Sequence, residues 1–459
     1  LVDQRAFAIG AGLVLCCQTS LLMFMPQRVD HHGWQLAFLV LTVAGLSDPK
    51  RVRGGLTMGL SSAASLVIGL ELIPFLAICG AAAALRWVWT REETARLRAY
   101  GFALAIGCGL GYLGFTSRDS SVWRCDALSP VWLSTMVAAG LLAAAISLLT
   151  TENRWLRLAA AAVCGAALTG GYALAFPQCL GRPEQVSPEL YRLWLSNVRE
   201  AKPLYVQPWT TVLTVISLPI VGVVGSVWAT RAAWGTRKFE AWLPVALISV
   251  VSLLLLLWQT RTGPAAQLMA VPGAAALAWA FIPRLSRSGS MLVRTLGVVA
   301  AFLIVSGLGL QLIVNQVPGK PDSARMKAIN RANGRCPMLQ ALRPIARLPA
   351  TTIFTFVDMG PRLITVTHHK AVAGPYHRNG DAILDVHHAF DGAPENARAI
   401  MLRHGATLLM TCPNMSESTV YRARSPNGFY SRLAKGERFD WLIPVALPKG
   451  SPLLLWKIS

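Results

Sequence analysis

Asp30, His31 and His32 are the residues best suited to hold a metal ion. They stand in a short connection, 26–33, between two apolar segments. Carboxylates and imidazoles are common ligands of divalent cations, and Asp30 and His32, two residues apart, are able to face one ion. The alternative is a cap on the next helix, with Asp30 accepting backbone N–H bonds and the imidazoles among lipid headgroups. The residues by themselves leave the metal site, with Asp30 and His32 as ligands, and the helix cap both open.

A second polar motif, Asn-Val-Arg-Glu-Ala-Lys-Pro over 197–203, places Glu200 among basic and amide side chains. Read alone, it is typical of a solvated run of charges. Apolar residues around it recur at roughly helical spacing, namely Tyr191, Trp194, Val198 and Leu204. This pattern predicts an amphipathic segment at the membrane surface within 177–208.

Arg261 stands between two apolar segments with no acidic residue beside it in the sequence. An Arg at that position costs free energy unless its guanidinium extends to water or meets an anion. Its planar donors suit a phosphate group, such as that of a lipid carrier. Snorkelling to the interface and phosphate binding are equally compatible with the residues.

A last group of polar residues follows the apolar segments. Asp358, Gly360 and Pro361 form a turn after a predicted strand, and His377 and Arg378 stand in the polar stretch 376–380. Ligand-binding groups tend to gather at such turns, although an ordinary turn has the same composition. The pairs His368-His369 and His387-His388 also occur here, the second predicted on a helix surface.

The elements that position these residues are mostly apolar. Of 459 residues, 54% are hydrophobic and 14% are charged. This is a larger share of apolar residues than a soluble domain needs to fill its core. A helix crosses the bilayer with about 20 apolar residues, so we predict a membrane domain over 1–316 with about eleven spans. They lie near 6–25, 34–46, 55–71, 73–90, 100–116, 131–149, 157–176, 209–229, 243–259, 265–283 and 293–315. The span 34–46 is short, and only Leu72 separates the next two, so a re-entrant pair is an alternative.

Basic residues cluster in alternate connections, which predicts the orientation. Five connections are expected in the cytoplasm. Their basic residues are Lys50, Arg51 and Arg53; Arg86, Arg91, Arg96 and Arg98; Arg154 and Arg157; Arg231, Arg237 and Lys238; and Arg284, Arg287 and Arg294. The loops 26–33, 116–130, 177–208 and 260–264 then lie outside, together with everything after about 316. The net charge of +21 reflects this topology and contact with membrane lipids, and no nucleic-acid partner is expected.

The cysteines follow the same division. Cys16, Cys17, Cys79, Cys108 and Cys164 fall within predicted spans, where free Cys acts as a small apolar residue. Cys125 and Cys179 fall in two external loops, and Cys336 and Cys412 in the external domain. Each of these two pairs is expected to be able to form a disulfide in an oxidising periplasm.

The sequence after about 316 predicts a periplasmic α/β domain, 317–459, because short apolar runs alternate with polar stretches. Strands are predicted at 351–357, 363–367, 407–411 and 453–458, and a helix at 397–403.

The order of these motifs resembles the catalytic subunit of oligosaccharyltransferases, membrane enzymes of the C-type (GT-C) glycosyltransferase class. Asp30-His31-His32 resembles the family's second metal motif, Asp-x-His in archaeal members, and Glu200 resembles the Glu that links the metal to the acceptor. Arg261 is similar to the Arg that contacts the donor phosphate, and Asp358 with Gly360 to the end of the WWDYG motif. The family's first two spans, with a catalytic Asp between them, would precede Leu1, and an N-terminal portion is therefore expected upstream.

The resemblance implies a metal-assisted glycosyltransferase in the bacterial inner membrane. Mg²⁺ or Mn²⁺ would bind Asp30, His32 and Glu200, with Asp30 and Glu200 as catalytic residues and Arg261 on the phosphate of a polyprenyl-(di)phosphate donor. Asp358, His377 and Arg378 would bind the acceptor. Phe356 and Val357 replace the family's paired Trp, so the acceptor is expected to be a glycan, a lipid or a protein rather than necessarily an asparagine.

A competing hypothesis is a non-enzymatic flippase or transporter of polyprenyl-linked glycans, whose external domain binds a partner. Transporters commonly show internal repeats and charges near the membrane midplane. The charges of this chain fall at the ends of its spans, which favours the enzyme.

Overall fold

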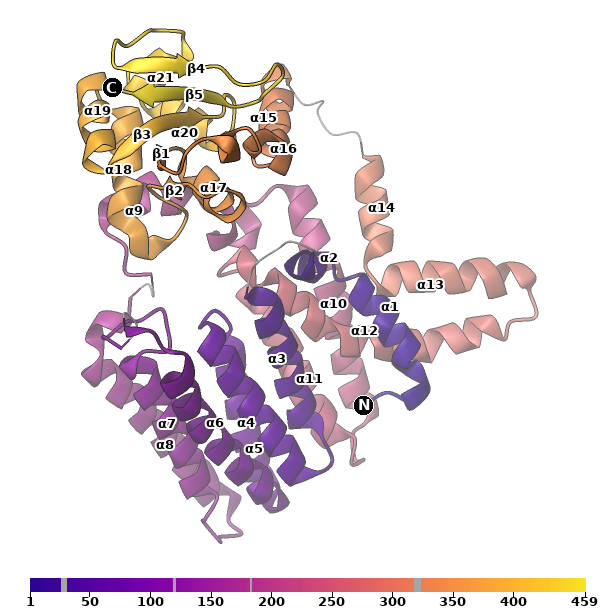
Figure 1. Cartoon of the computed structure of the whole chain (residues 1–459). Coiled ribbons are helices and arrows are strands. Elements are labelled where there is room, and N and C mark those ends of the chain that lie inside the picture. Colours follow the sequence, from indigo (N-terminus) through magenta and orange to yellow (C-terminus); the bar gives the residue numbers. More distant parts are fainter. Residues whose placement is uncertain (26–30, 119–120, 182–183, 318–322) are drawn as a thin grey trace. The chain divides into compact units, whose positions relative to one another are not determined.

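The computed structural model describes residues 1–25, 31–118, 121–181, 184–317 and 323–459. The chain divides by its contacts into two compact units, both visible in Figure 1. The helical unit comprises Leu1–Gln185 and Arg199–Val317, and the sheet unit comprises Val186–Val198 and Pro318–Ser459. A short piece of the predicted external loop 177–208 therefore packs with the C-terminal residues.

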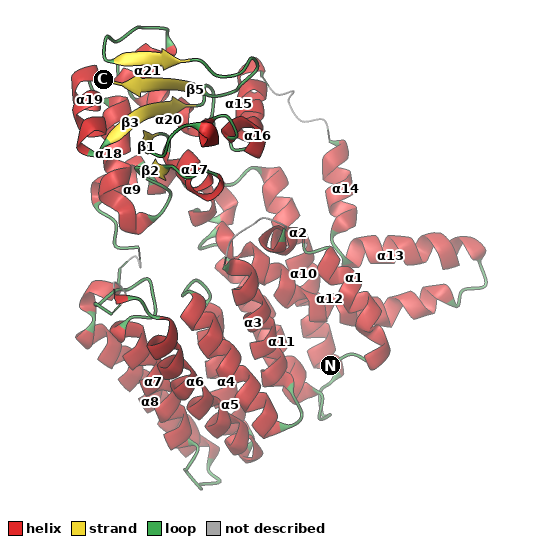
Figure 2. Cartoon of the chain, viewed as in Figure 1, coloured by secondary structure: helices red, strands yellow, loops and turns green. Residues whose placement is uncertain are grey.

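The helical unit contains a helix or a bent helix pair at each of the predicted spans (Figure 2). They are α1 (Phe7–Leu15), α2 (Gln18–Leu21), α3 (His32–Ser47), α4 (Arg51–Ile68), α5 (Ile73–Trp89), α6 (Thr94–Phe115), α7 (Pro130–Ile146), α8 (Arg154–Ala175), α10 (Trp209–Ala232), α11 (Phe239–Leu255), α12 (Gly263–Ser286), α13 (Val298–Val305) and α14 (Leu308–Gln316). Long apolar sequences become helices because a helix satisfies its backbone hydrogen bonds within itself.

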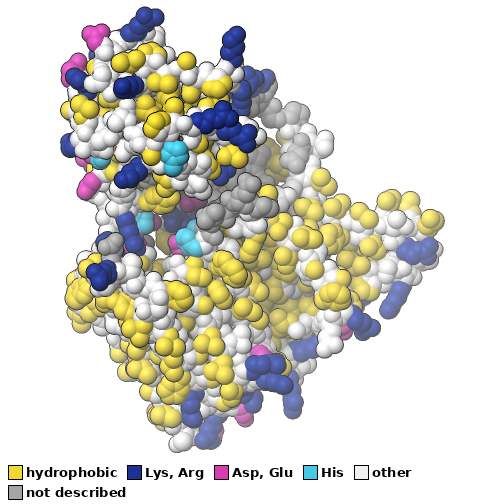
Figure 3. Space-filling model, in the orientation of Figure 1, with side chains coloured by type: hydrophobic (Ala, Val, Ile, Leu, Met, Phe, Trp, Pro, Cys, Tyr) yellow, Lys and Arg dark blue, Asp and Glu magenta, His cyan; other side chains and the backbone are white. Residues whose placement is uncertain are grey.

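Length and apolar composition suit three described helices for crossing a membrane: Arg154–Ala175, Trp209–Ala232 and Thr260–Ser286. Two bent pairs, Gln4–Leu15 with Gln18–Phe24 and Val293–Val305 with Leu308–Val314, would raise the number to five. Four further apolar helices are shorter, namely α3, α5, α7 and α11. Hydrophobic side chains cover much of the visible surface of the helical unit (Figure 3), as expected for helices that face lipid.

The first and last predicted spans are bent, by 72° and 86°. The last bends at Gly307, whose φ of +74° is a left-handed conformation that favours glycine. Side-chain amides surround these bends: Gln18 donates to the buried Gln311 (2.6 Å), and the buried Gln267 accepts from the Thr19 backbone N–H (3.0 Å). Hydropathy did not predict the bends, because the amides that accompany them come from helices far apart in the chain.

Glycines allow α10 and α12 to pack with their backbones in contact. A Cβ at Gly273 would collide with the carbonyl oxygen of Gly222, and one at Gly225 with the carbonyl of Gly273. Small residues at such crossings let helices approach closely in a membrane, where van der Waals packing drives association.

We expect Gly273→Ala to destabilise the helical unit by about 1–3 kcal/mol, the usual cost of overpacking. Thermal unfolding of the purified chain in detergent measures this effect. Gly170→Ala on α8 is the matched control, because no atom lies within 4 Å of its Cβ position. Equal melting temperatures for the two variants would contradict the proposed backbone contact.

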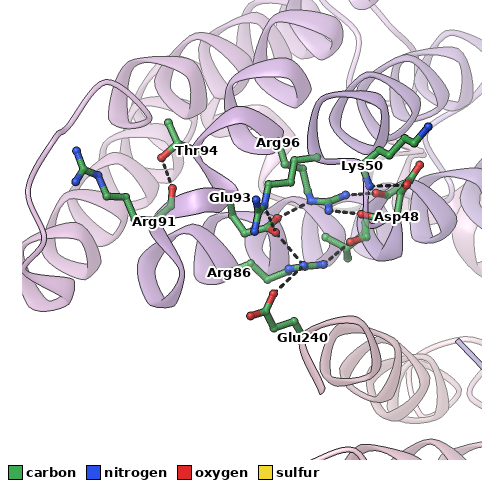
Figure 4. A network of polar contacts seen from close by, with 11 residues as sticks. Asp48, Lys50, Arg86, Arg91, Glu93, Thr94, Arg96 and Glu240 are labelled. Carbon is green, nitrogen blue, oxygen red and sulfur yellow. Dashed lines mark hydrogen bonds and ion pairs between the residues drawn. The ribbon is translucent and has the colours of Figure 1, made fainter. Parts of the chain in front are cut away.

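A buried ionic network joins α3, α4, α5 and α6 at one end of the helical unit (Figure 4). Glu93, before α6, accepts from Arg51 (3.2 Å), Arg86 (3.1 Å) and Arg96 (2.6 Å). Arg96 also donates to the carbonyl of Gly45 (2.5 Å), near the C-terminus of α3. Some of the basic residues predicted on the cytoplasmic side therefore also join helices through ion pairs and hydrogen bonds.

The sheet unit is an α/β domain, as predicted. Its five-stranded sheet has the order β2-β1-β3-β5-β4, in which β2, β1 and β3 are parallel and β5 is antiparallel to β3 and β4. The strands are β1 (Thr352–Phe354), β2 (Lys370–Ala371), β3 (Ala406–Thr411), β4 (Leu442–Val445) and β5 (Leu454–Ile458). The helices are α9 (Pro188–Leu193), α15 (Ala324–Arg335), α16 (Leu339–Leu342), α17 (Gly360–Val366), α18 (Gly380–Asp391), α19 (Pro394–Arg403), α20 (Ser416–Arg424) and α21 (Phe429–Ala434).

The predicted strands at 407–411 and 453–458 and the helix at 397–403 are confirmed as β3, β5 and α19. The strand predicted at 351–357 is confirmed only over Thr352–Phe354, because Val357 begins a 3-10 turn. The predicted strand at 363–367 is wrong, because these residues belong to α17. Pro361 occupies the first turn of that helix, where its fixed φ favours helical geometry. Leu363 is buried, and the next two residues, Ile364 and Thr365, are both exposed, which differs from the strict alternation of a strand.

The predicted amphipathic segment is also broken. It forms α9 and short 3-10 turns, and its buried apolar residues are Leu190, Leu195 and Leu204. Polar contacts hold α9 in the sheet unit: Glu189 pairs with His388 (2.9 Å), and Arg424 donates to the carbonyl of Leu193 (3.2 Å).

Both expected disulfides are present. Cys125 pairs with Cys179 in the helical unit, and Cys336 with Cys412 in the sheet unit. The five cysteines of the predicted spans are free, as expected.

Candidate active site

The candidate metal site begins at the N-terminus of α3. His31, His32 and Glu71 each present a ligand atom, and these atoms all lie within 4.8 Å of one another. Glu71 stands in the connection between α4 and α5, and its Oε1 lies 3.0 Å from His31 Nε2. The two imidazole rings are stacked, with centroids 4.4 Å apart. Two imidazoles and a carboxylate form a donor set that fits a divalent cation.

Gln35, one turn into α3, holds the Glu71 carboxylate from the other side. Its Nε2 donates to Glu71 Oε2 (2.8 Å), and the Gln35 side chain is fully buried. Gly69 leaves room for this contact, because a Cβ there would collide with Glu71 Oε2 and lie 2.8 Å from Gln35 Nε2. The hydrogen bond from Gln35 and the contact with His31 favour the ionised form of this carboxylate.

The sequence did not single out Glu71. The available signal was a charged residue at the junction of two apolar segments, which commonly marks a functional position. Of the predicted ligands, His32 lies in the cluster, Asp30 falls outside the described residues, and Glu200 is not a member. Metal binding by Asp30, His32 and Glu200 stays a prediction.

Glu200 lies in the 3-10 turn Arg199–Ala201, and backbone contacts attach this segment to the turn Thr260–Thr262 that contains Arg261. The Thr260 N–H donates to the carbonyl of Lys202 (2.7 Å), and Gln207 bridges the carbonyl of Arg199 (2.7 Å) and the Thr260 hydroxyl (3.2 Å). The fold thus brings together two motifs that are far apart in the sequence.

Arg261 has an acidic partner after all. Its NH2 lies 3.7 Å from Glu184 Oε1, a residue that the sequence had not connected with it. Arg261 Nε is buried and has no hydrogen-bond partner within the described part of the chain. The guanidinium is partly exposed, and its pairing with Glu184 shows that it is able to receive an anionic group.

The histidine cluster and Arg261 lie at the same end of the helical unit. The start of α3 packs on the turn Leu22–Phe24, because a Cβ at Gly33 would lie 2.9 Å from the carbonyl of Met23. The preceding α2 is fastened to the start of α12, where Ser20 donates to the carbonyl of Pro264 (2.7 Å). Since α12 begins directly after Arg261, His32 and Arg261 share this end. The ionic network of Figure 4 lies at the other end of α3.

In the sheet unit, Asp358 occupies the 3-10 turn Val357–Met359 between β1 and α17. Glu417 caps this turn by accepting from the backbone N–H groups of Val357 and Asp358, both at 2.8 Å. Burial and the nearby Asp358 carboxylate raise the pKa of Glu417. The Asp358 side chain is exposed, so the turn presents it to solvent from a fixed backbone.

The turn of Asp358 lies next to the segment that leads to His377 and Arg378. A Cβ at Gly360 would collide with the carbonyl of Ala373, so the two segments touch. His377 and Arg378 form the turn His377–Asn379 before α18, with Arg378 exposed. Acceptor binding by Asp358, His377 and Arg378 stays a prediction.

The remaining histidines have structural contacts. His369 is buried, accepts from the Thr351 N–H (3.3 Å) and lies 2.9 Å from the carbonyl of Ile345. The predicted surface position of His387 is wrong, because this side chain is buried and its Nδ1 lies 2.8 Å from Arg424. Packing of α20 against α18 covers it, which the sequence of α18 alone does not reveal.

The fold of this chain is similar to that of solved archaeal oligosaccharyltransferases. Archaeal oligosaccharyltransferase AglB from Archaeoglobus fulgidus, in complex with an inhibitory peptide and a dolichol-phosphate, matches with a TM-score of 0.61 and 14% identity over 100% of this chain. The apo form of the A. fulgidus enzyme matches with a TM-score of 0.54 and 15% identity over 90% of this chain and 55% of that chain. The same enzyme tethered to an acceptor peptide with the NVT sequon gives 0.54 and 14% over 94% of this chain and 56% of that chain.

The predicted resemblance to oligosaccharyltransferase catalytic subunits is thereby confirmed at the level of fold. This chain spans 60% of the length of AglB. No family model and no curated protein matches the sequence.

Proposed function

We propose that this protein is a glycosyltransferase that moves a sugar or oligosaccharide from a polyprenyl-(di)phosphate carrier to an acceptor. The observation that carries the proposal is the placement of His32 and Arg261 at one end of a helical unit with an oligosaccharyltransferase fold. Transfer of a sugar from a lipid phosphate requires positive charge near that phosphate, and a cation site and an Arg at the same end would supply it.

Arg261 would hold the donor phosphate through its planar guanidinium, which is able to exchange Glu184 for the phosphate oxygens. Asp30, His32 and Glu200 are assigned to a cation, Mg²⁺ or Mn²⁺, with Asp30 and Glu200 as catalytic carboxylates. When bound, such a cation would neutralise charge on the departing lipid phosphate. The attachment of Glu200 to the Arg261 turn supports this arrangement.

Asp358, His377 and Arg378 are proposed to bind the acceptor, a glycan, a lipid or a protein. AglB was solved with an inhibitory peptide and a dolichol-phosphate, and the A. fulgidus enzyme was solved with a tethered acceptor peptide, which supports a lipid carrier and an acceptor as the partners proposed here. The exposed Asp358 on a capped turn is suited to fix an acceptor group by hydrogen bonds.

We also propose about eleven spans in a bacterial inner membrane, with the loops 26–33, 116–130, 177–208 and 260–264 and the domain 317–459 in the periplasm. The disulfides Cys125–Cys179 and Cys336–Cys412 support an oxidising compartment for these parts. The basic residues at the opposite end, including Arg51 and Arg86, support a cytoplasmic location for that end.

The proposal is tested with the purified full chain in liposomes that contain a polyprenyl-diphosphate oligosaccharide and a metal. A transferase releases polyprenyl phosphate or diphosphate in step with sugar gained by the acceptor. A flippase moves the intact carrier across the bilayer and releases none. Carrier movement without release would reject the enzyme and favour the flippase.

A further inference from the structure

The connection between α4 and α5 contributes a carboxylate to the histidine cluster, and no predicted role uses it. Glu71 lies forty residues beyond His31 in the sequence, yet its Oε1 is 3.0 Å from His31 Nε2. We propose that Glu71 is a ligand of a divalent cation, together with His31 and His32. This inference deepens the proposed function and rests on it for the role of the cation in transfer.

The distances within the cluster suit one ion. The three ligand atoms lie within 4.8 Å of one another. Ligands opposite each other on an ion, each at about 2.1 Å, are about 4.2 Å apart, so small side-chain movements complete the site. The imidazoles favour a transition metal such as Mn²⁺ over Mg²⁺, which prefers oxygen ligands and retains its waters.

The surroundings of Glu71 are built to hold it. Gln35 is fully buried and donates to Glu71 Oε2 (2.8 Å), which leaves Oε1 to face the imidazoles. Gln35 Oε1, the other polar atom of this amide, is buried with no hydrogen-bond partner among the described residues. Such an arrangement is costly, and the bond from Nε2 to Glu71 offsets part of that cost. Gly69 supplies the space for the Glu71 carboxylate.

A simple ion pair between a Glu and a His lacks the second imidazole and the buried amide that surround Glu71. Glu189 and His388 form such a pair in the sheet unit, at 2.9 Å, with side chains 46% and 43% exposed. Glu71 is 29% exposed and has a second imidazole and a buried amide beside it. Glu189→Gln is therefore the matched control for Glu71→Gln.

Binding of Mn²⁺ to the full chain, measured by electron paramagnetic resonance without donor or acceptor, tests the inference. We expect Glu71→Gln to raise the Kd for Mn²⁺ at least tenfold, Gly69→Ala to raise it by displacing the carboxylate, and Glu189→Gln to leave it unchanged. Glu71→Asp, which keeps the charge, should retain tighter binding than Glu71→Gln.

A Kd for Glu71→Gln within twofold of the wild-type value would overturn the inference, as would the absence of Mn²⁺ binding to the wild-type chain. Equal weakening by Glu71→Asp and Glu71→Gln would also overturn it, because it would indicate a steric defect rather than lost coordination. Failure of the proposed function is distinguishable from failure of this inference. If the wild-type chain binds Mn²⁺ through Glu71 but transfers no sugar, the metal site stands and the transferase activity is rejected.

Discussion

Replacing His32 by Ala is expected to lower the rate of sugar transfer by about 10²–10³-fold, the usual effect of removing one group that stabilises charge in a transition state. His32 offers one of the three clustered ligand atoms, and its loss would remove one of the two imidazole nitrogens available to the cation. Asp30→Ala should act in the same direction. The rate of polyprenyl phosphate release, measured over a series of Mn²⁺ concentrations, quantifies both losses.

The matched control is His404→Ala, since His404 pairs with Asp385 (2.7 Å) in the sheet unit and has no assigned role in transfer. This variant should retain the wild-type rate. Undiminished transfer by His32→Ala and Asp30→Ala, together with insensitivity to a chelator, would reject the metal assignment. High Mn²⁺ concentrations should partly restore His32→Ala, because a weakened site still fills by mass action.

The second large effect is expected at Arg261. Arg261→Ala should raise the Kd for the lipid-linked donor by about 10–100-fold, since a hydrogen bond to a charged group contributes about 1.5–3 kcal/mol. Arg261→Lys should fall between Ala and the wild type, because Lys keeps the charge and loses the planar pair of donors. Equilibrium binding of a fluorescent polyprenyl-diphosphate sugar, measured without acceptor, separates affinity from turnover.

Arg154→Ala is a suitable comparison, because Arg154 lies at the start of α8 and stacks on Trp155 at 5.6 Å. It should bind donor as the wild type does. If Arg261→Ala binds the donor as tightly as the wild type, phosphate binding by Arg261 is rejected, and its side chain only extends to the membrane interface. The ion pair with Glu184, at 3.7 Å, is long and partly exposed, so it should compete only weakly with a phosphate.

If the cation site includes Glu71, a carboxylate is present that the resemblance to oligosaccharyltransferases did not predict. The known motif supplies Asp30 and His32, whereas Glu71 comes from the next connection along the chain. Its position also fixes the geometry of the histidines, because His31 and Gln35, both at the start of α3, contact the same carboxylate. One residue would then order both ligands and their supporting helix.

The amino-acid sequence by itself determined the features that depend on local composition. Long apolar stretches predicted the helices, because a buried backbone must satisfy its own hydrogen bonds wherever the chain goes. The placement of cysteines outside the spans predicted both disulfide pairs. Short apolar runs such as 407–411 predicted buried strands of an α/β domain.

The tertiary structure decided everything that joins distant segments. Glu71 meets His31, Glu184 meets Arg261, and Val186–Val198 packs with the C-terminal residues. The bend at Gly307 and the helix at Gly360–Val366 likewise depend on neighbours that hydropathy does not reveal. The physical reason is that hydropathy and turn propensity are properties of a local window, whereas a site forms where packing brings charged groups from separate elements within bonding distance.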